Sequence, residues 1–321
     1  MNDLGKIMVV VNPHSANGAA GRQWPSIKRI LEERLGTFES RLTRGSGHAT
    51  EIVRDSLSKG FDTILSVGGD GTNNEIVNGF FDGDEPVRPE ACFGCISRGT
   101  GSDLIKTLKI PKETQGAIEV LLTGRRHPID VGRMSFLDHK DRRTTRYFVN
   151  IASFGMGGAV DEKVNTTTKR FGGFISFLWA TLFTLVRYEN QTVTLSADEA
   201  GPRELRIVDV AVANGQYFGG GMHVAPSAVM DDGLFDVVVL GDFTKWEAVR
   251  DGMKIYRGTH IRHPKVEWFR ARRLEARSSE RVLLDVDGEQ PGKLPASFEV
   301  VAGALRVFVP QAFPAGGGKA A

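Results

Sequence analysis

The stretch SVGGDGTNNEIVNG, from Ser66 to Gly79, decides the fold. The apolar run Thr63 to Val67 is typical of a buried strand, and it ends directly in Gly68-Gly69-Asp70-Gly71-Thr72. A helical pattern follows, from Asn73 to Phe80. Glycine lets the main chain approach a phosphate group closely, and amide groups at a helix start attract anions. We therefore predict a phosphate-binding loop, although the Walker pattern of phosphate-binding loops is absent from the chain.

The polar side chains of this loop favour a nucleotide over a bare phosphate. Thr72 supplies a hydroxyl group. Asp70 would repel phosphates unless a cation lies with them, so it indicates ATP bound together with Mg²⁺. Glu75, on the helix that follows, belongs to the same candidate site.

Three further loops follow predicted strands in this half of the chain: VVVNPHSANG, TRGSGHAT and SRGTGSD. Loops at the carboxyl ends of neighbouring parallel strands converge on one crevice, where open α/β sheets bind ligands. Arg22 stands near the next helix start, where a cation could meet phosphates. The candidate nucleotide-binding residues are Asn12, Pro13, Arg22, Thr43, Gly68, Gly69, Asp70, Gly71, Thr72, Glu75, Gly99, Thr100 and Gly101.

Hydrophobic patterns divide the chain into two domains. Residues 1–130 alternate strand-like and helix-like segments, which predicts a doubly wound, mostly parallel α/β sheet. Residues 131–302 are mostly strand-like and alternating, which predicts an antiparallel β-rich domain with helices near 170–187 and 244–256. The last strand, near 303–311, is a candidate to return to the first domain, and residues 312–321 are predicted to form a disordered tail.

Composition excludes several classes of protein. The formal net charge is +2 over 321 residues, too small for a general nucleic-acid binder. Cys92 and Cys95 lie in a strand-like run and are expected to be small core residues. The apolar run near the N-terminus is too short for an export signal, so we expect a cytoplasmic protein. Phe171 to Val186 is too short for a usual membrane span, but a helix there could contact the inner face of the membrane.

Taken together, these motifs resemble the catalytic domain of the diacylglycerol kinase and sphingosine kinase family, most closely its soluble bacterial members. GGDGTNNEIVNG is similar to the family's G-G-D-G-T-x-N-E-V-x-N-G signature, and NPHSANG, TRGSGHAT and SRGTGSD resemble its other loops. Arg98 and Ser102 depart from the last of these patterns. The resemblance continues through DDGLFDV and DGE and covers nearly the whole chain. It implies a kinase-like fold and transfer of a phosphoryl group from ATP to a lipid hydroxyl.

Acidic residues of the second domain are the candidates for the chemistry. A lipid hydroxyl must lose a proton during phosphoryl transfer, and a positioned carboxylate can accept it. The resemblance implies that Asp287 is this base and that Glu289 assists on the metal or nucleotide side. It also implies a structural Mg²⁺ held by Asp231, Asp236 and the carbonyl group of Leu234, with Asp130 in a supporting role.

Two other hypotheses remain open at this point. GGDGT also occurs in NAD kinases, which would phosphorylate a ribose hydroxyl without detergent or liposomes. A non-catalytic nucleotide- or lipid-binding module would tolerate replacement of Asp287, whereas a kinase would not. The motifs leave open whether the lipid is diacylglycerol, phosphatidylglycerol, ceramide or a long-chain base, and whether the chain forms a homodimer.

Overall fold

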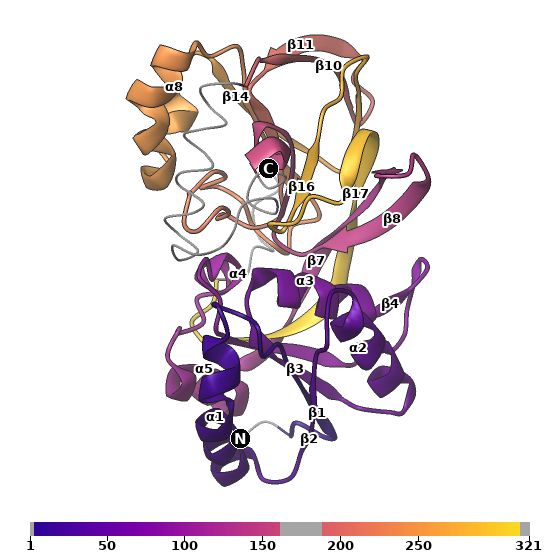
Figure 1. Cartoon of the computed structure of the whole chain (residues 1–321), viewed down its shortest axis with the longest axis vertical. Coiled ribbons are helices and arrows are strands. Elements are labelled where there is room, and N and C mark those ends of the chain that lie inside the picture. Colours follow the sequence, from indigo (N-terminus) through magenta and orange to yellow (C-terminus); the bar gives the residue numbers. More distant parts are fainter. Residues whose placement is uncertain (1–2, 161–187, 315–321) are drawn as a thin grey trace. The chain divides into compact units, whose positions relative to one another are not determined.

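The computed structural model describes residues 3–160 and 188–314, and these divide into two compact units (Figure 1). One unit comprises residues 1–130 together with 302–321, and the other comprises residues 131–301. Two long strands run through the boundary: β7 (Arg125–Asp138) and β17 (Gly292–Val309).

The first unit is built on a parallel sheet. Its strands lie in the order β2 (Glu39–Leu42), β1 (Ile7–Val11), β3 (Thr63–Gly68), β6 (Cys92–Ser97) and the second half of β17. Every pairing along this order is parallel. All residues of β1, β3 and β6 are buried, which matches their continuous apolar runs. Cys92 and Cys95 are free thiols within this core, as predicted, and burial raises the pKa of both.

Helices cover both sides of this sheet (Figure 1). The first pair, α1 (Ala19–Leu35) and α5 (Thr114–Thr123), pack against each other. The second pair, α2 (His48–Ser58) and α3 (Asp70–Gly79), do the same. The helix α3 begins at Asp70, three residues before the predicted start, so the GDGT part of the loop forms its first turn. A short hairpin, β4 (Phe81–Asp82) and β5 (Glu85–Pro86), follows α3.

Two antiparallel sheets form the second unit. The first has the order β14 (Val266–Ala271), β13 (Phe235–Leu240), β12 (Asp209–Ala213), β9 (Ile151–Gly155) and β16 (Leu284–Val286). The second runs from β11 (Arg203–Ile207) through β10 (Gln191–Ala197) and β15 (Arg273–Arg277) to the first half of β17. The strand β8 (Arg143–Phe148) pairs with β7.

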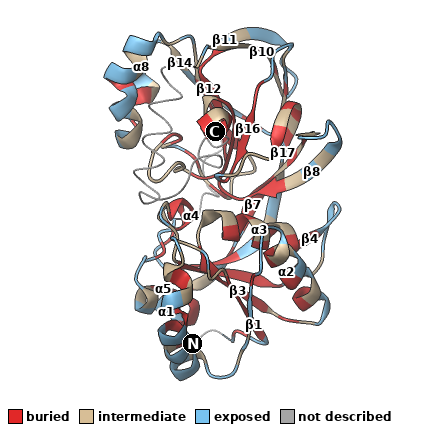
Figure 2. Ribbon diagram, in the orientation of Figure 1, coloured by how far each residue is buried: buried red, intermediate tan, exposed pale blue. Residues whose placement is uncertain are grey.

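The inward faces of the two sheets share one core. Phe148 stacks on Phe235 with ring centroids 5.5 Å apart, and Phe154 stacks on Phe298 at 5.9 Å. These rings come from β8, β13, β9 and β17, so they join both sheets into a β-sandwich, which is drawn in red in Figure 2. The predicted fold class, a parallel α/β part followed by an antiparallel β-rich part, is therefore confirmed.

The structure adds detail to several predicted segments. Residues 265–278, inside the stretch predicted to be mostly strand-like, contain two strands in different sheets, because the chain changes sheet at Arg272, where the Asp198 carboxylate accepts N–H bonds from Arg272 and Arg273. The helix predicted near 244–256 is α8 (Lys245–Asp251) followed by the 3₁₀ helices η1 (Gly252–Arg257) and η2 (His260–Arg262). Phe313 lies inside the predicted tail, yet it is buried, packs on His127 and accepts a bond from Arg125.

The predicted helix at Phe171 to Val186 and residues 315–321 of the predicted tail lie outside the described residues. Within the described ranges, no helix has the length and apolar character needed to cross a membrane.

Candidate functional site

The two glycine loops of the first unit touch each other, as the sequence predicts. A Cβ atom on Gly99 would lie 2.5 Å from the Cα atom of Gly69, and one on Gly69 would lie 3.1 Å from the Cα atom of Gly99. The Arg98 amide also donates to the carbonyl oxygen of Gly68 at 2.6 Å. Only glycine permits this backbone approach, which brings the ends of β3 and β6 together. Loops so placed, beside the start of α3, are suited to an anion.

Asp70 connects one loop to the other. Its carboxylate accepts backbone N–H bonds from Asp103, at 3.1 and 3.2 Å, and from Leu104 at 3.3 Å. These are the first amides of α4 (Asp103–Thr107). The carboxylate therefore caps α4 and fixes the second loop against the first.

The neighbouring strand ends are joined by hydrogen bonds. Asn12 donates from its side chain to the Thr72 hydroxyl at 2.9 Å, and its backbone amide donates to Val67 at 3.0 Å. The Thr43 amide donates to Val11 at 2.8 Å, and Thr43 is buried. Asn12, Thr43, Gly68 and Gly99 thus follow the carboxyl ends of four parallel strands, where open α/β sheets bind ligands.

Three other predicted residues have structural contacts. Glu75 accepts N–H bonds from Gly47 and Ala49, at 2.9 and 3.1 Å, and so caps α2. The Pro13 carbonyl accepts a bond from Gly21 at 3.2 Å, which fixes the first loop on α1. Arg22 donates to the carbonyl oxygen of Asn17 at 3.3 Å. These contacts shape the loops.

The two departures from the family pattern brace the second loop. Arg98 donates to the Thr114 hydroxyl of α5 and, at 3.2 Å, to the Ser97 carbonyl, and burial lowers the pKa of Arg98. The Ser102 hydroxyl lies 2.7 Å from that of Ser97 and donates to the Gly99 carbonyl at 3.2 Å. The sequence motifs gave no role to either residue. Hydrophobic periodicity cannot predict such contacts, because they are hydrogen bonds of polar side chains.

In the second unit, Asp287 organises the turn Asp287-Gly288-Glu289. Its carboxylate accepts N–H bonds from Val149, Asn150 and Ile151, at 3.0, 3.1 and 2.9 Å. The Asp287 residue is 8% exposed and has a φ of +49°, which few non-glycine residues adopt. Three bonds from β9 and the residues before it hold this conformation.

Glu289 is the more accessible carboxylate of the turn. Its side chain is 34% exposed and forms an ion pair with Arg146 of β8. Arg146 was not predicted from the sequence, because the pattern of β8 contains no signal for a partner 143 residues away. Asn150 was also missed; it donates to the Tyr217 carbonyl, while its buried side-chain oxygen has no hydrogen-bond partner.

The acidic turn Asp231-Asp232-Gly233-Leu234, which holds part of the predicted metal set, lies beside an arginine. The Asp236 carboxylate is fully buried, accepts the Trp268 indole N–H at 2.7 Å and lies 3.6 Å from Arg270 Nε. Arg270 Nη1 also lies 3.6 Å from Asp232. Burial raises the pKa of Asp232 and of Asp236. The guanidinium group of Arg270 supplies positive charge to Asp232 and Asp236, while the metal-binding role of Asp231, Leu234 and Asp236 stays a prediction.

The Asp130 side chain, for which a metal-supporting role was predicted, accepts a hydrogen bond from the backbone. It is buried, and its Oδ1 atom accepts the Gly303 amide at 2.8 Å. Gly303 lies in β17 with a φ of +60°. The bond therefore fixes β17 where it enters the first unit. No group of three or more histidine, cysteine, aspartate or glutamate side chains suited to a metal ion occurs in residues 3–160 and 188–314.

Comparison with known proteins gives the same division of the chain. Residues 6–134 match the family described as "Diacylglycerol kinase catalytic domain", and residues 150–309 match the "YegS C-terminal NAD kinase beta sandwich-like domain". The chain is 28% identical over 304 residues to a diacylglycerol kinase of Staphylococcus carnosus, covering 94% of each chain.

Two solved structures share the fold. A putative diacylglycerol kinase from Bacillus anthracis superposes with a TM-score of 0.78 at 22% identity, covering 98% of each chain. Yeast NADH kinase superposes with a TM-score of 0.53 at 11% identity, covering 96% of this chain and 84% of that one. The two matched families span most of the sequence, and the chain belongs to the diacylglycerol kinase family of lipid kinases.

Proposed function

We propose that this kinase transfers the γ-phosphoryl group of ATP to the free hydroxyl of a diacylglycerol-type membrane lipid. One observation carries the nucleotide half of the proposal: Gly69 and Gly99 touch, and Asp70 locks their two loops together at the carboxyl ends of β3 and β6. The similarity to named diacylglycerol kinases over nearly the full chain supports the lipid half.

In this proposal the first unit binds the triphosphate. Backbone amides of Gly68 to Thr72 and of Gly99 to Gly101 donate to phosphate oxygens, and the N-terminus of α3 adds a favourable dipole. Asp70 stands beside these amides and would hold Mg²⁺ close to the phosphates. The metal ion would neutralise charge that develops on the γ-phosphoryl group.

The second unit presents the proton acceptor. The lipid hydroxyl oxygen attacks the γ-phosphorus, the bond to the bridging oxygen breaks, and ADP leaves. We assign the hydroxyl proton to Glu289, because the Asp287 carboxylate is committed to three backbone amides. Asp287 then positions the turn, and Arg146 orients Glu289 through their ion pair.

The test uses ATP labelled on its γ-phosphorus. Purified protein is incubated with diacylglycerol, phosphatidylglycerol, ceramide or a long-chain base in mixed micelles, with and without Mg²⁺. We expect label in phosphatidic acid and, in each lipid reaction, none without Mg²⁺.

A parallel reaction offers NAD without detergent, since the likeness to NADH kinase extends over the fold. Label in NAD with none in any lipid would overturn the proposal in favour of a nucleotide kinase. Label only in ceramide or a long-chain base would support a lipid kinase whose acceptor is that lipid and not diacylglycerol.

A further inference from the structure

An exposed apolar stripe lies on α8 and η1 of the second unit. Trp246, Val249 and Met253 are 72%, 56% and 70% exposed. They follow one another three and four residues apart, which places them along one side of a helical segment. Only two other large hydrophobic side chains, Leu42 and Trp268, are similarly exposed among the described residues. Exposed apolar side chains gathered in this way mark an interaction surface.

Basic residues are frequent in the segment that carries this stripe. The segment 245–265 contains six lysines and arginines and two carboxylates. Both carboxylates are already paired: Glu247 with Lys265 at 2.6 Å, and Asp251 with Lys254 at 2.7 Å and Arg250 at 2.6 Å. Asp251 is buried, and its bonds to Arg250 and Lys254 lower its pKa to about 2. The surface therefore carries an excess of positive charge, which complements an anionic surface.

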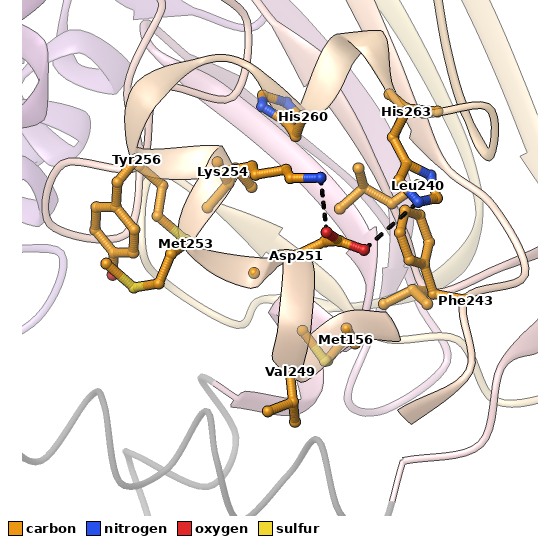
Figure 3. A pocket seen from close by; sticks show the side chains of 16 residues that line it. Met156, Leu240, Phe243, Val249, Asp251, Met253, Lys254, Tyr256, His260 and His263 are labelled. Atoms are coloured by element: carbon orange, nitrogen blue, oxygen red, sulfur yellow. Dashed lines mark ion pairs between the residues drawn. The ribbon is translucent and has the colours of Figure 1, made fainter. Parts of the chain in front are cut away.

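Behind the stripe lies an apolar cavity of about 240 Å³ (Figure 3). Val249 and Met253 belong both to the stripe and to the wall of the cavity. Met156, Leu240 and Phe243 line the wall as well, while Lys254 and Asp251 form an ion pair within it (Figure 3). The apolar surface therefore continues from the stripe into the wall of this cavity.

We propose that Trp246, Val249 and Met253 form a docking surface for an anionic lipid bilayer. This rests on the proposed function, since a kinase of a membrane lipid must reach its substrate at the bilayer. Tryptophan is favoured at the interface of membrane and water, and lysine and arginine beside an apolar stripe attract anionic headgroups. A protein partner would bury the apolar stripe equally well, but the excess of basic side chains favours a lipid surface.

Binding to vesicles tests the surface directly. The double variant Trp246→Glu/Met253→Glu is compared with the full-length chain by co-sedimentation with vesicles of phosphatidylglycerol and phosphatidylcholine. We expect at least about a tenfold loss of binding, because two apolar contacts are replaced by charges that anionic lipids repel. The matched control, Ala200→Glu/Gly201→Glu, adds the same two charges at exposed positions of the β10–β11 turn and should bind like the parent chain.

The fluorescence of Trp246 gives a second measurement that does not depend on folding of the double variant. In the parent chain, vesicles with brominated acyl chains should quench tryptophan emission, and Trp246→Phe should abolish most of that quenching. Equal sedimentation of the double variant and the parent chain, or quenching unchanged in Trp246→Phe, would overturn the docking surface. A homodimer that the double variant dissociates, with no vesicle binding by the parent chain, would assign the stripe to a second copy instead.

Activity separates this inference from the proposed function. The single variant Trp246→Glu, at a residue outside the cavity wall, should lose turnover of diacylglycerol in vesicles while it keeps turnover of a short-chain diacylglycerol dispersed in water. Vesicle binding through Trp246 without phosphorylation of any lipid would contradict the proposed function and still support the docking surface.

Discussion

At the scale of single residues, the turn that follows β16 contains two carboxylates with different contacts. Asp287 is tied to three backbone amides, and Glu289 is one-third exposed and paired with Arg146. Glu289→Gln should lower kcat by about 10²- to 10⁴-fold, since the amide cannot accept the proton. It should leave the melting temperature and ATP affinity nearly unchanged.

Asp287→Asn is the comparison. Here an amide group would face the N–H donors of Val149, Asn150 and Ile151, so we expect a loss of about 3 kcal/mol in the free energy of unfolding along with lost activity. Urea titration and steady-state kinetics on both variants check this division. If Glu289→Gln keeps full kcat, the base is another group.

The contact of the two glycine loops is also decided by single residues. Gly99→Ala would bring a methyl group to 2.5 Å from the Cα atom of Gly69, so the loops must separate. We expect a loss of about 1–3 kcal/mol in stability and a weaker affinity for ATP, both measurable by thermal melting with and without the nucleotide. Gly45→Ala is the matched control, because no atom lies within 4 Å of a Cβ there. Unchanged ATP affinity in Gly99→Ala would contradict a phosphate site at this contact.

At the scale of elements, the short helix η2 contains a histidine whose protonation opposes folding. His260 is buried, and its Nε2–H donates to the Val224 carbonyl at 2.9 Å. Burial, with a smaller contribution from nearby His223, lowers the pKa of His260 below its usual 6.5. The unfolded chain therefore binds a proton at a higher pH than the folded one.

The sign of the pH dependence follows from this difference. The stability that neutral His260 contributes is complete above pH 6.5 and falls as the pH drops from 6.5 towards the lowered pKa of the folded state. Urea unfolding at a series of pH values should show this fall, and His260→Gln should remove part of it. An NMR titration that places the pKa of His260 at or above 6.5 would contradict the prediction.

At the scale of the whole molecule, β17 carries the chain from the second unit back into the first. Arg306 and Val307 pair with Cys92 and Phe93 of β6, and Leu305, Val307 and Phe308 are buried. A chain that ends at Val301 would lose these contacts, with about 1.5–3 kcal/mol for each large apolar side chain, an amount comparable to the stability of a domain. We expect aggregation, seen by light scattering. A chain that ends at Pro314 keeps every contact described here and should melt like the full-length protein; equal melting of both truncated chains would refute the role of β17.

The fold class and the positions of the glycine loops could be predicted from the sequence, because their signals are local. Continuous apolar runs predict β1, β3 and β6 as buried strands, and glycines directly after them predict the loops. Hydrophobic period alone could not show that the run from 265 to 278 is divided between two sheets, since both strands alternate in the same way.

Only the tertiary structure decided which side chains meet. The Arg146–Glu289 pair, the Asp70 cap on α4 and the three amides on Asp287 join positions 143, 33 and about 137 residues apart. The same holds for Arg270, whose guanidinium lies 3.6 Å from Asp232 and from Asp236, the second of which belongs to the predicted metal set. Such contacts are set by which strands lie side by side, and the local pattern of a strand determines its own faces without specifying its neighbours.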